Sequence, residues 1–117
     1  MERRIRLRHA DDFARLRQKG TSIHNRNLLL SYMPNGLSSN RYGFVTSGRL
    51  GGAVVRNRLR RLLREAIRGL HPRLGTGHDV VLIARQPLIN QPFASVQQLV
   101  FDLLRKAGLV LLESDGT

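Results

Sequence analysis

The sequence contains no cysteine. This absence excludes disulfide bonds and any zinc site built on cysteine ligands, and it fits a reducing compartment. No run of apolar residues approaches the roughly 18 that a membrane-spanning helix needs. The basic N-terminal segment, residues 1–8, lacks the apolar stretch of a signal peptide. We therefore expect a cytoplasmic protein that has no membrane partner.

Acidic residues are also scarce. Eight Asp and Glu stand against 20 Lys and Arg, which gives a formal net charge of +12. Like charges in such excess repel one another, and proteins usually keep them for a polyanionic partner. Only Lys19 and Lys106 are lysines, and the planar guanidinium of arginine suits phosphates and bases. A GC-rich genome is an alternative explanation of the arginine bias, but it does not explain the net charge. Composition therefore favours nucleic acid as the partner.

The sequence shows no pattern typical of a catalytic site. Its acids are scattered, so no carboxylate cluster is predicted to hold the metal ions of a protein nuclease. The four histidines share no metal-ligand spacing. The glycine-rich segment 48–52 lacks a P-loop pattern, and we interpret it as a turn that brings backbone close to RNA.

The 117 residues form one predicted domain, 1–117, with a basic N-terminal segment at 1–8 and a mobile tail at 113–117. Local patterns predict helices at 10–19, 55–70 and 93–107, and strands in the second half of 22–33, at 41–47 and at 79–85. Residues 109–112 are expected to form a short strand or an extended tail. The first two strands are expected to pair antiparallel. This order, α-β-β-α-β-α, predicts an α/β (α+β) two-layer sandwich with helices packed on a small sheet.

The middle helix has two chemically distinct sides. At 100° per residue its apolar residues form one stripe that we expect to face the sheet; they are Val55, Leu59, Leu62, Leu63, Ala66 and Leu70. The opposite side is cationic, and only Glu65 interrupts it. It carries Asn57, Arg60, Arg61, Arg64 and Arg68, with Arg56 and Arg58 on its flanks. A phosphate backbone would turn the mutual repulsion of these side chains into attraction through counterion release.

The segment 51–65, GGAVVRNRLRRLLRE, resembles the signature of the bacterial ribonuclease P protein component. In that signature Gly-x-Ala-Val precedes Arg-Asn-Arg, a basic pair follows, and Arg-Glu closes the motif. The flanking segments Asp12-Phe13, Gly20-Thr21-Ser22, Gly43-Phe44 and 79–85 also stand in the family's order. The resemblance covers residues 7 to 106.

The resemblance implies an α/β sandwich with a left-handed βαβ crossover, and one protein bound to one catalytic RNA. That RNA holds the Mg²⁺ ions that the RNA–protein holoenzyme requires and hydrolyses the 5′ leader from precursor tRNA. The protein is the non-catalytic subunit of this endoribonuclease, and no cofactor of its own is expected. It binds the RNA and the leader and improves affinity for substrate and metal.

The resemblance also assigns residues to the two RNA contacts. The RNA-binding helix is expected to use Arg56, Asn57, Arg58, Arg60, Arg61, Arg64 and Arg68, with Arg49 in the preceding turn. The leader-binding cleft is expected to contain Phe13, Arg17 and Ser31. Phe13 either stacks on an unpaired base or belongs to the core. The sequence departs from the family at Ser47-Gly48-Arg49, where Ser-Lys-Lys is usual, and at Arg17 and Ser31, where further aromatics are common. Charge is then expected to hold the leader more than stacking does.

Three other functions are weighed against this hypothesis. A general RNA-binding or ribosome-associated protein fits the composition equally well but not the ordered motif. A free-standing metal-dependent nuclease lacks its carboxylates. A DNA-binding helix-turn-helix protein would need a second helix shortly before the arginine-rich helix, and the sequence predicts none, so DNA is not expected as a partner.

Overall fold

The computed structural model describes residues 10–111, so the predicted basic segment at 1–8 and the predicted tail at 113–117 lie outside the described residues. Within this range the predicted helices are confirmed. They are α1 (Ala10–Lys19), α2 (Ala53–Leu70) and α3 (Phe93–Lys106). No helix of the described range is long and apolar enough to cross a membrane.

Four strands form one sheet in the order β1-β2-β4-β3. They are β1 (Thr21–His24), β2 (Leu28–Pro34), β3 (Arg41–Val45) and β4 (His78–Ala84). Strand β4 pairs antiparallel with β2 and parallel with β3. Because α2 joins the adjacent parallel strands β3 and β4, these elements form a βαβ unit. The handedness of its crossover stays a prediction.

One expectation for the sheet was wrong, and one strand was missed. Strands β2 and β3 do not pair, because β4 lies between them. The apolar run of β4 is buried on both faces and therefore takes a central position. The short strand β1 was not predicted as a separate element. Three of its four residues are exposed, so no alternating pattern marks it, and its antiparallel ladder with β2 defines it instead.

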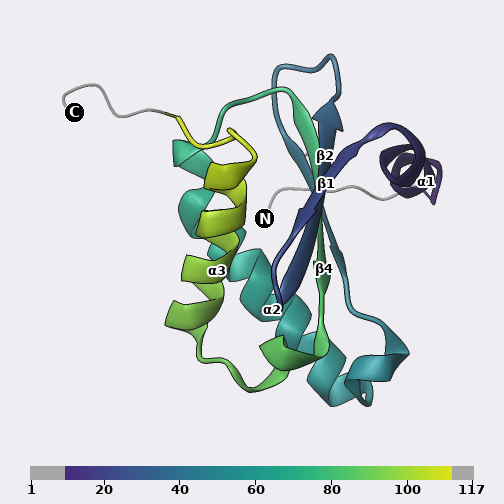
Figure 1. The fold of residues 1–117 in the computed structure, drawn as a ribbon, viewed down its shortest axis with the longest axis vertical. Coiled ribbons are helices and arrows are strands. Elements are labelled where there is room, and N and C mark those ends of the chain that lie inside the picture. The colour runs from purple at the N-terminus through teal and green to yellow at the C-terminus, as the bar shows by residue number, and fades with distance from the viewer. Residues whose placement is uncertain (1–9, 112–117) are drawn as a thin grey trace.

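Helices cover both faces of the sheet (Figure 1): α2 and α3 pack on one face and α1 on the other. The main core lies under α2 and α3. The predicted α2 stripe contributes Leu59, Leu63, Ala66 and Leu70 to it, and Ile67, absent from that stripe, is also buried. A smaller core beneath α1 is centred on Leu16 and Val81. The α+β class is confirmed, with α1 as a partial third layer.

Candidate nucleic-acid interface

The cationic side of α2 points away from the main core, as its sequence predicts. Asn57, Arg58, Arg61 and Arg68 are exposed, whereas Arg56, Arg60 and Arg64 are half-buried. The last three are four residues apart and form one row along the helix. Arg60, the middle residue of this row, is held beside the end of β3. Its guanidinium donates to Thr46 Oγ1 at 2.9 Å and to Asn57 Oδ1 at 3.0 Å.

Most of these guanidinium groups have no anionic partner among the residues that the structure describes. The one acid on α2, Glu65, accepts from Arg68 at 3.4 Å on the exposed surface. Among residues 10–111, the side chains of Arg56, Arg61 and Arg64 form no hydrogen bond or ion pair. The Nε atoms of Arg56 and Arg64 are buried without an acceptor. The guanidinium groups of Arg56, Arg61 and Arg64 carry positive charge without an anion beside them in the described range, so an external anion that contacts their terminal nitrogens would stabilise this face.

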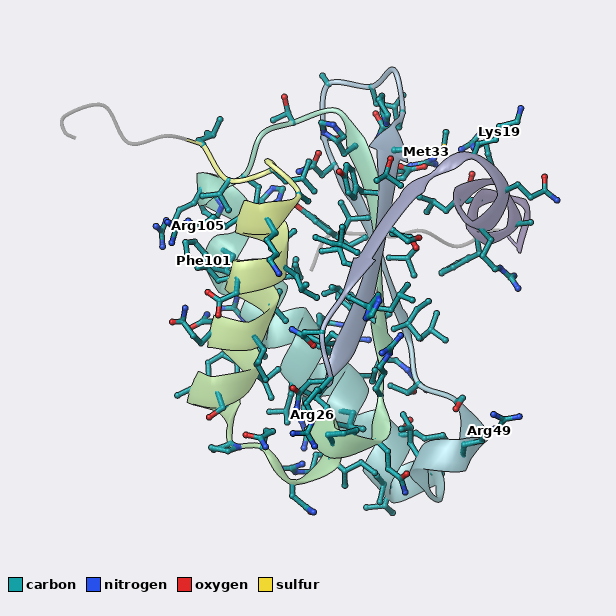
Figure 2. All side chains as sticks on the ribbon, viewed as in Figure 1. Lys19, Arg26, Met33, Arg49, Phe101 and Arg105 are labelled. Carbon is teal, nitrogen blue, oxygen red and sulfur yellow. The ribbon has the colours of Figure 1, made fainter. Side chains whose placement is uncertain are left out.

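Arg49 extends the cationic surface beyond the start of α2. It lies on the short 3-10 helix Gly48–Leu50, which the buried side chain of Leu50 anchors to the core. Gly51 follows with φ 140°, a backbone region that disfavours other residues. A Cβ atom there would lie 3.2 Å from Val55 Cβ. This turn leaves the Arg49 side chain projecting outward from the surface (Figure 2).

The three residues expected in the cleft line one pocket between α1 and the sheet. Phe13, Arg17 and Ser31 share it with Leu16, Val45, Val81 and Ile83, and its volume is about 190 Å³. Phe13 is half-buried and also packs against the small core, so it contributes to the core and the pocket alike. Ser31 is held in place because its Oγ lies 2.7 Å from the Ser22 Oγ of β1. The pocket therefore offers one ring, one guanidinium and an apolar floor.

A buried ion network positions α1 beside this pocket, and sequence reasoning missed it. Asp79, fully buried on β4, accepts from Arg41 Nε at 2.9 Å and Arg41 Nη2 at 2.8 Å. Arg15 of α1 reaches the same carboxylate at 3.4 Å and also pairs with Asp12 at 3.0 Å. These contacts link α1 to β3 and β4. The partners are 38 and 64 residues from Asp79 in sequence, and no local pattern connects them.

The network also controls the ionisation of Asp79. Burial alone would raise the pKa of this carboxyl. Hydrogen bonds from Arg41 and Asn35, and the charges of Arg41 and Arg15, outweigh burial and hold the pKa below its ordinary value. Asp79 is therefore an anion that its arginines neutralise. Across residues 10–111, no three His, Cys, Asp or Glu side chains are grouped to hold a metal ion.

Comparisons with known proteins agree with this geometry. A profile of the ribonuclease P family matches residues 1–108. The ribonuclease P protein component of Roseiflexus castenholzii is 44% identical, and the match covers 94% of this chain and 91% of the relative. The corresponding protein of Chloroflexus aurantiacus is 45% identical, over 100% of this chain and 87% of the relative.

Solved structures give the same result. The RNase P protein of Staphylococcus aureus has a TM-score of 0.84 at 29% identity, and the match covers 91% of this chain and 97% of that one. The RNase P protein of Thermotoga maritima has a TM-score of 0.81 at 30% identity, over 86% and 96% of the two chains. The family profile spans nearly the whole chain, the identities extend over the same length, and the folds superpose. The chain belongs to the ribonuclease P protein component family.

Proposed function

We propose that this chain is the RNA-binding, non-catalytic subunit of ribonuclease P, the ribonucleoprotein that removes the 5′ leader from precursor tRNA. The unpaired arginines of α2 carry this proposal. Within the described residues the side chains of Arg56, Arg61 and Arg64 have no acceptor, although all three lie on one helix. RNA phosphates would supply those acceptors. In this assignment α2 and Arg49 contact the catalytic RNA, with one protein bound to each RNA.

The pocket between α1 and the sheet is proposed to hold the leader. Its Phe13 ring offers a stacking surface, and the exposed Arg17 guanidinium offers a phosphate contact. Because Ser31 contributes a small hydroxyl that is already paired with Ser22, one aromatic ring serves the pocket. Leader binding is therefore proposed to depend more on charge than on stacking.

The RNA subunit is proposed to catalyse hydrolysis of the phosphodiester bond. Two carboxylates on the elements that line the pocket, Asp12 of α1 and Asp79 of β4, are engaged by Arg15 and Arg41. Positive charges so close to both carboxylates oppose the binding of a second cation. The Mg²⁺ ions of the holoenzyme would then be held by RNA phosphates, and the protein would act by neutralising charge and positioning the substrate.

A cleavage assay at limiting Mg²⁺ tests this proposal. Purified protein is mixed with a catalytic ribonuclease P RNA and a leader-bearing precursor tRNA, at a concentration of Mg²⁺ too low for the RNA alone. We expect strong protein-dependent cleavage at the mature 5′ end. Replacing Arg60, Arg61 and Arg64 with alanine should weaken this stimulation, because three phosphate contacts are lost.

A second arm examines the pocket. The Phe13→Leu variant keeps an apolar side chain but removes the ring, so it should weaken binding of leader-bearing precursor while leaving affinity for mature tRNA unchanged. Absence of stimulation by well-folded wild-type protein, across a Mg²⁺ and salt series, would instead favour a general RNA-binding protein without a processing role.

A further inference from the structure

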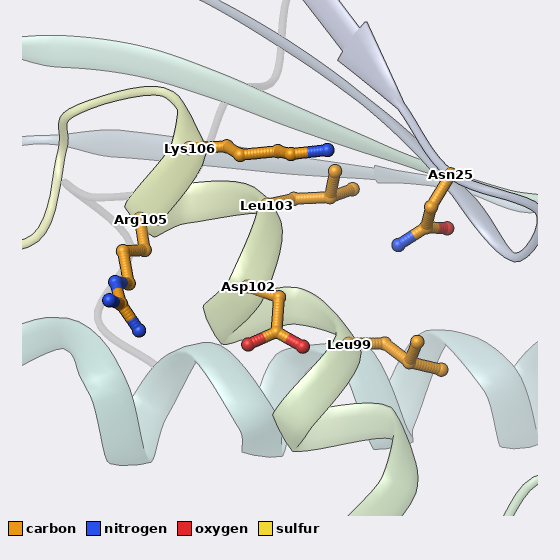
Figure 3. Close-up of a pocket in the computed structure, with 6 residues that line it drawn as sticks. All are labelled: Asn25, Leu99, Asp102, Leu103, Arg105 and Lys106. Carbon is orange, nitrogen blue, oxygen red and sulfur yellow. The ribbon is translucent and has the colours of Figure 1, made fainter.

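A groove that the proposed function does not use runs along α3. Two adjoining pockets share Leu99 and lie between α3 and the β1–β2 turn. One has a volume of about 510 Å³ and is lined by Asn25, Leu99, Asp102, Leu103, Arg105 and Lys106 (Figure 3). The other, of about 300 Å³, is lined by Asn27, Gln91, Ser95, Gln98 and Leu99. The groove lies on the face of the sheet opposite the α1 pocket.

One face of α3 supplies the helical wall. Its groove residues follow at steps of three or four, from Ser95 through Leu99 and Asp102 to Lys106. The eleven steps from the first of these residues to the last, at 1.5 Å each, give a wall of roughly 16 Å. The composition changes along it: serine and glutamine line one end, leucines the middle, and Arg105 with Lys106 the other end. An extended ligand fits this shape better than a compact one.

The opposite wall is a turn whose geometry is fixed. Asn25 Oδ1 accepts from the backbone N–H groups of Asn27 and Leu28, both at 2.8 Å. Arg85 secures the same turn, because its backbone N–H donates to the Asn27 carbonyl at 2.9 Å and its Nη1 donates to the Asn25 carbonyl at 3.2 Å. A wall held by these bonds loses little freedom when a ligand binds.

These bonds also determine which way the Asn25 amide faces. Its oxygen is used by the turn, so Nδ2 is directed toward α3, as Figure 3 shows. The Lys106 side chain extends over Leu103 toward the same space. Across the groove, Asp102 accepts from Gln98 at 2.9 Å through Oδ1. The groove thus presents oriented donors at one end, an acceptor beside them and an apolar floor of Leu99 and Leu103.

We propose that this groove binds an unpaired single-stranded segment of RNA. Asparagine, glutamine and aspartate side chains match the edges of bases, and the leucine floor suits the base faces. Arg105, Lys106 and the exposed Arg26 at the turn would contact phosphates. The inference rests on the proposed function only in taking RNA as the partner.

The substitution Asn25→Asp tests the groove with little change to the turn. Aspartate keeps the oxygen that accepts from Asn27 and Leu28 but replaces the Nδ2 donor with a second, anionic oxygen. We expect affinity for the RNA that occupies the groove to fall about two- to tenfold. Binding of the catalytic RNA to the protein, and of precursor tRNA to the holoenzyme, is measured separately, so that the result shows which RNA occupies the groove.

Ser38→Asp is the matched control, because it adds the same single negative charge on the exposed β2–β3 loop, outside both pockets. If the Asn25→Asp variant does not fold, Lys106→Gln repeats the test without altering the turn. Its control is Lys19→Gln on α1, which removes the same charge outside the groove. Melting temperatures verify folding for each variant.

Crosslinking then locates the contact. Since the chain has no cysteine, a photoreactive group on Ser95→Cys reports from the groove alone. We expect adducts with RNA in the holoenzyme, and their yield should fall with Asn25→Asp. The proposal is overturned if Asn25→Asp and Ser38→Asp have equal effects and the label forms no RNA adduct, or if the adduct joins two copies of the chain. If the protein still stimulates cleavage of precursor tRNA, and this stimulation still depends on Arg60, Arg61 and Arg64, the proposed function holds even though the groove does not bind RNA.

Discussion

Asp79 shows how a single residue can position a helix beside a pocket. It is fully buried, and it ties Arg41 of β3 and Arg15 of α1 to β4. Removing one member of a buried pair costs more than the pair contributes, since the other member keeps an uncompensated charge. The two arginines remain partly in contact with water, which limits that penalty.

We expect Asp79→Asn to lower the free energy of unfolding by about 3 kcal/mol at pH 7, measured by urea denaturation. The folded-state pKa of Asp79 lies below its ordinary value. Its contribution is therefore complete above the unfolded pKa of about 3.9 and is lost as the pH falls through the folded pKa. The difference between wild type and variant should shrink below about pH 4. Glu65→Gln, an exposed acid beside Arg68, should cost less than about 1 kcal/mol.

For single residues, the sequence predicted which side chains lie in the same pocket. It did not predict the hydrogen bonds and ion pairs that hold those side chains in place. Phe13, Arg17 and Ser31 line one pocket as expected. Their assignment came from a family resemblance, and the structure adds that Ser31 is paired with Ser22. The contacts of Asp79 were not predictable, because hydrogen-bond partners far apart in sequence become neighbours only when the sheet forms.

Among the elements, α2 carries an apolar stripe in the core and a cationic face on the surface, on opposite sides of the same helix. Leu59 and Leu63 are fully buried, while Arg61 on the other side is exposed. The 3.6-residue period separates the two sets by geometry alone, which explains why this helix was predictable. Strand β1 and the pairing of β3 with β4 were not predictable. Pairing depends on which strand is buried between the others, and the local pattern of either strand does not show this.

Alanine at Arg60, Arg61 and Arg64 should change the salt dependence of RNA binding. Each phosphate contact contributes about 0.7 to 0.9 to the slope of log affinity against log salt, so the loss of all three should lower the slope by about 2 to 3. Titrations across a range of KCl concentrations measure it. Leu62→Ala, on the half-buried side of the same helix, should leave the slope unchanged. Equal slopes for the triple variant and wild type would contradict a phosphate contact by α2.

The whole molecule carries a charge that its fold compensates only in part. Of the formal +12, the ion pairs within residues 10–111 neutralise arginines mainly around Asp12, Asp79 and Glu65. Within the same range, the side chains of Arg56, Arg61 and Arg64 on α2 have no such partner. Self-repulsion of this kind opposes the compact state, and a bound polyanion would relieve it.

Millimolar tripolyphosphate should therefore raise the melting temperature of the free protein. A ligand at about 100 times its dissociation constant adds about 2.7 kcal/mol of stability, which corresponds to a rise of roughly 10 °C in a domain of this size. NaCl at the same ionic strength serves as the control, because it screens charge without occupying the α2 face. Arg60, Arg61 and Arg64 supply much of the site, so their triple alanine variant should show a smaller rise. If NaCl and tripolyphosphate shift the wild type equally, screening alone explains the stabilisation, and α2 does not bind anions as a site.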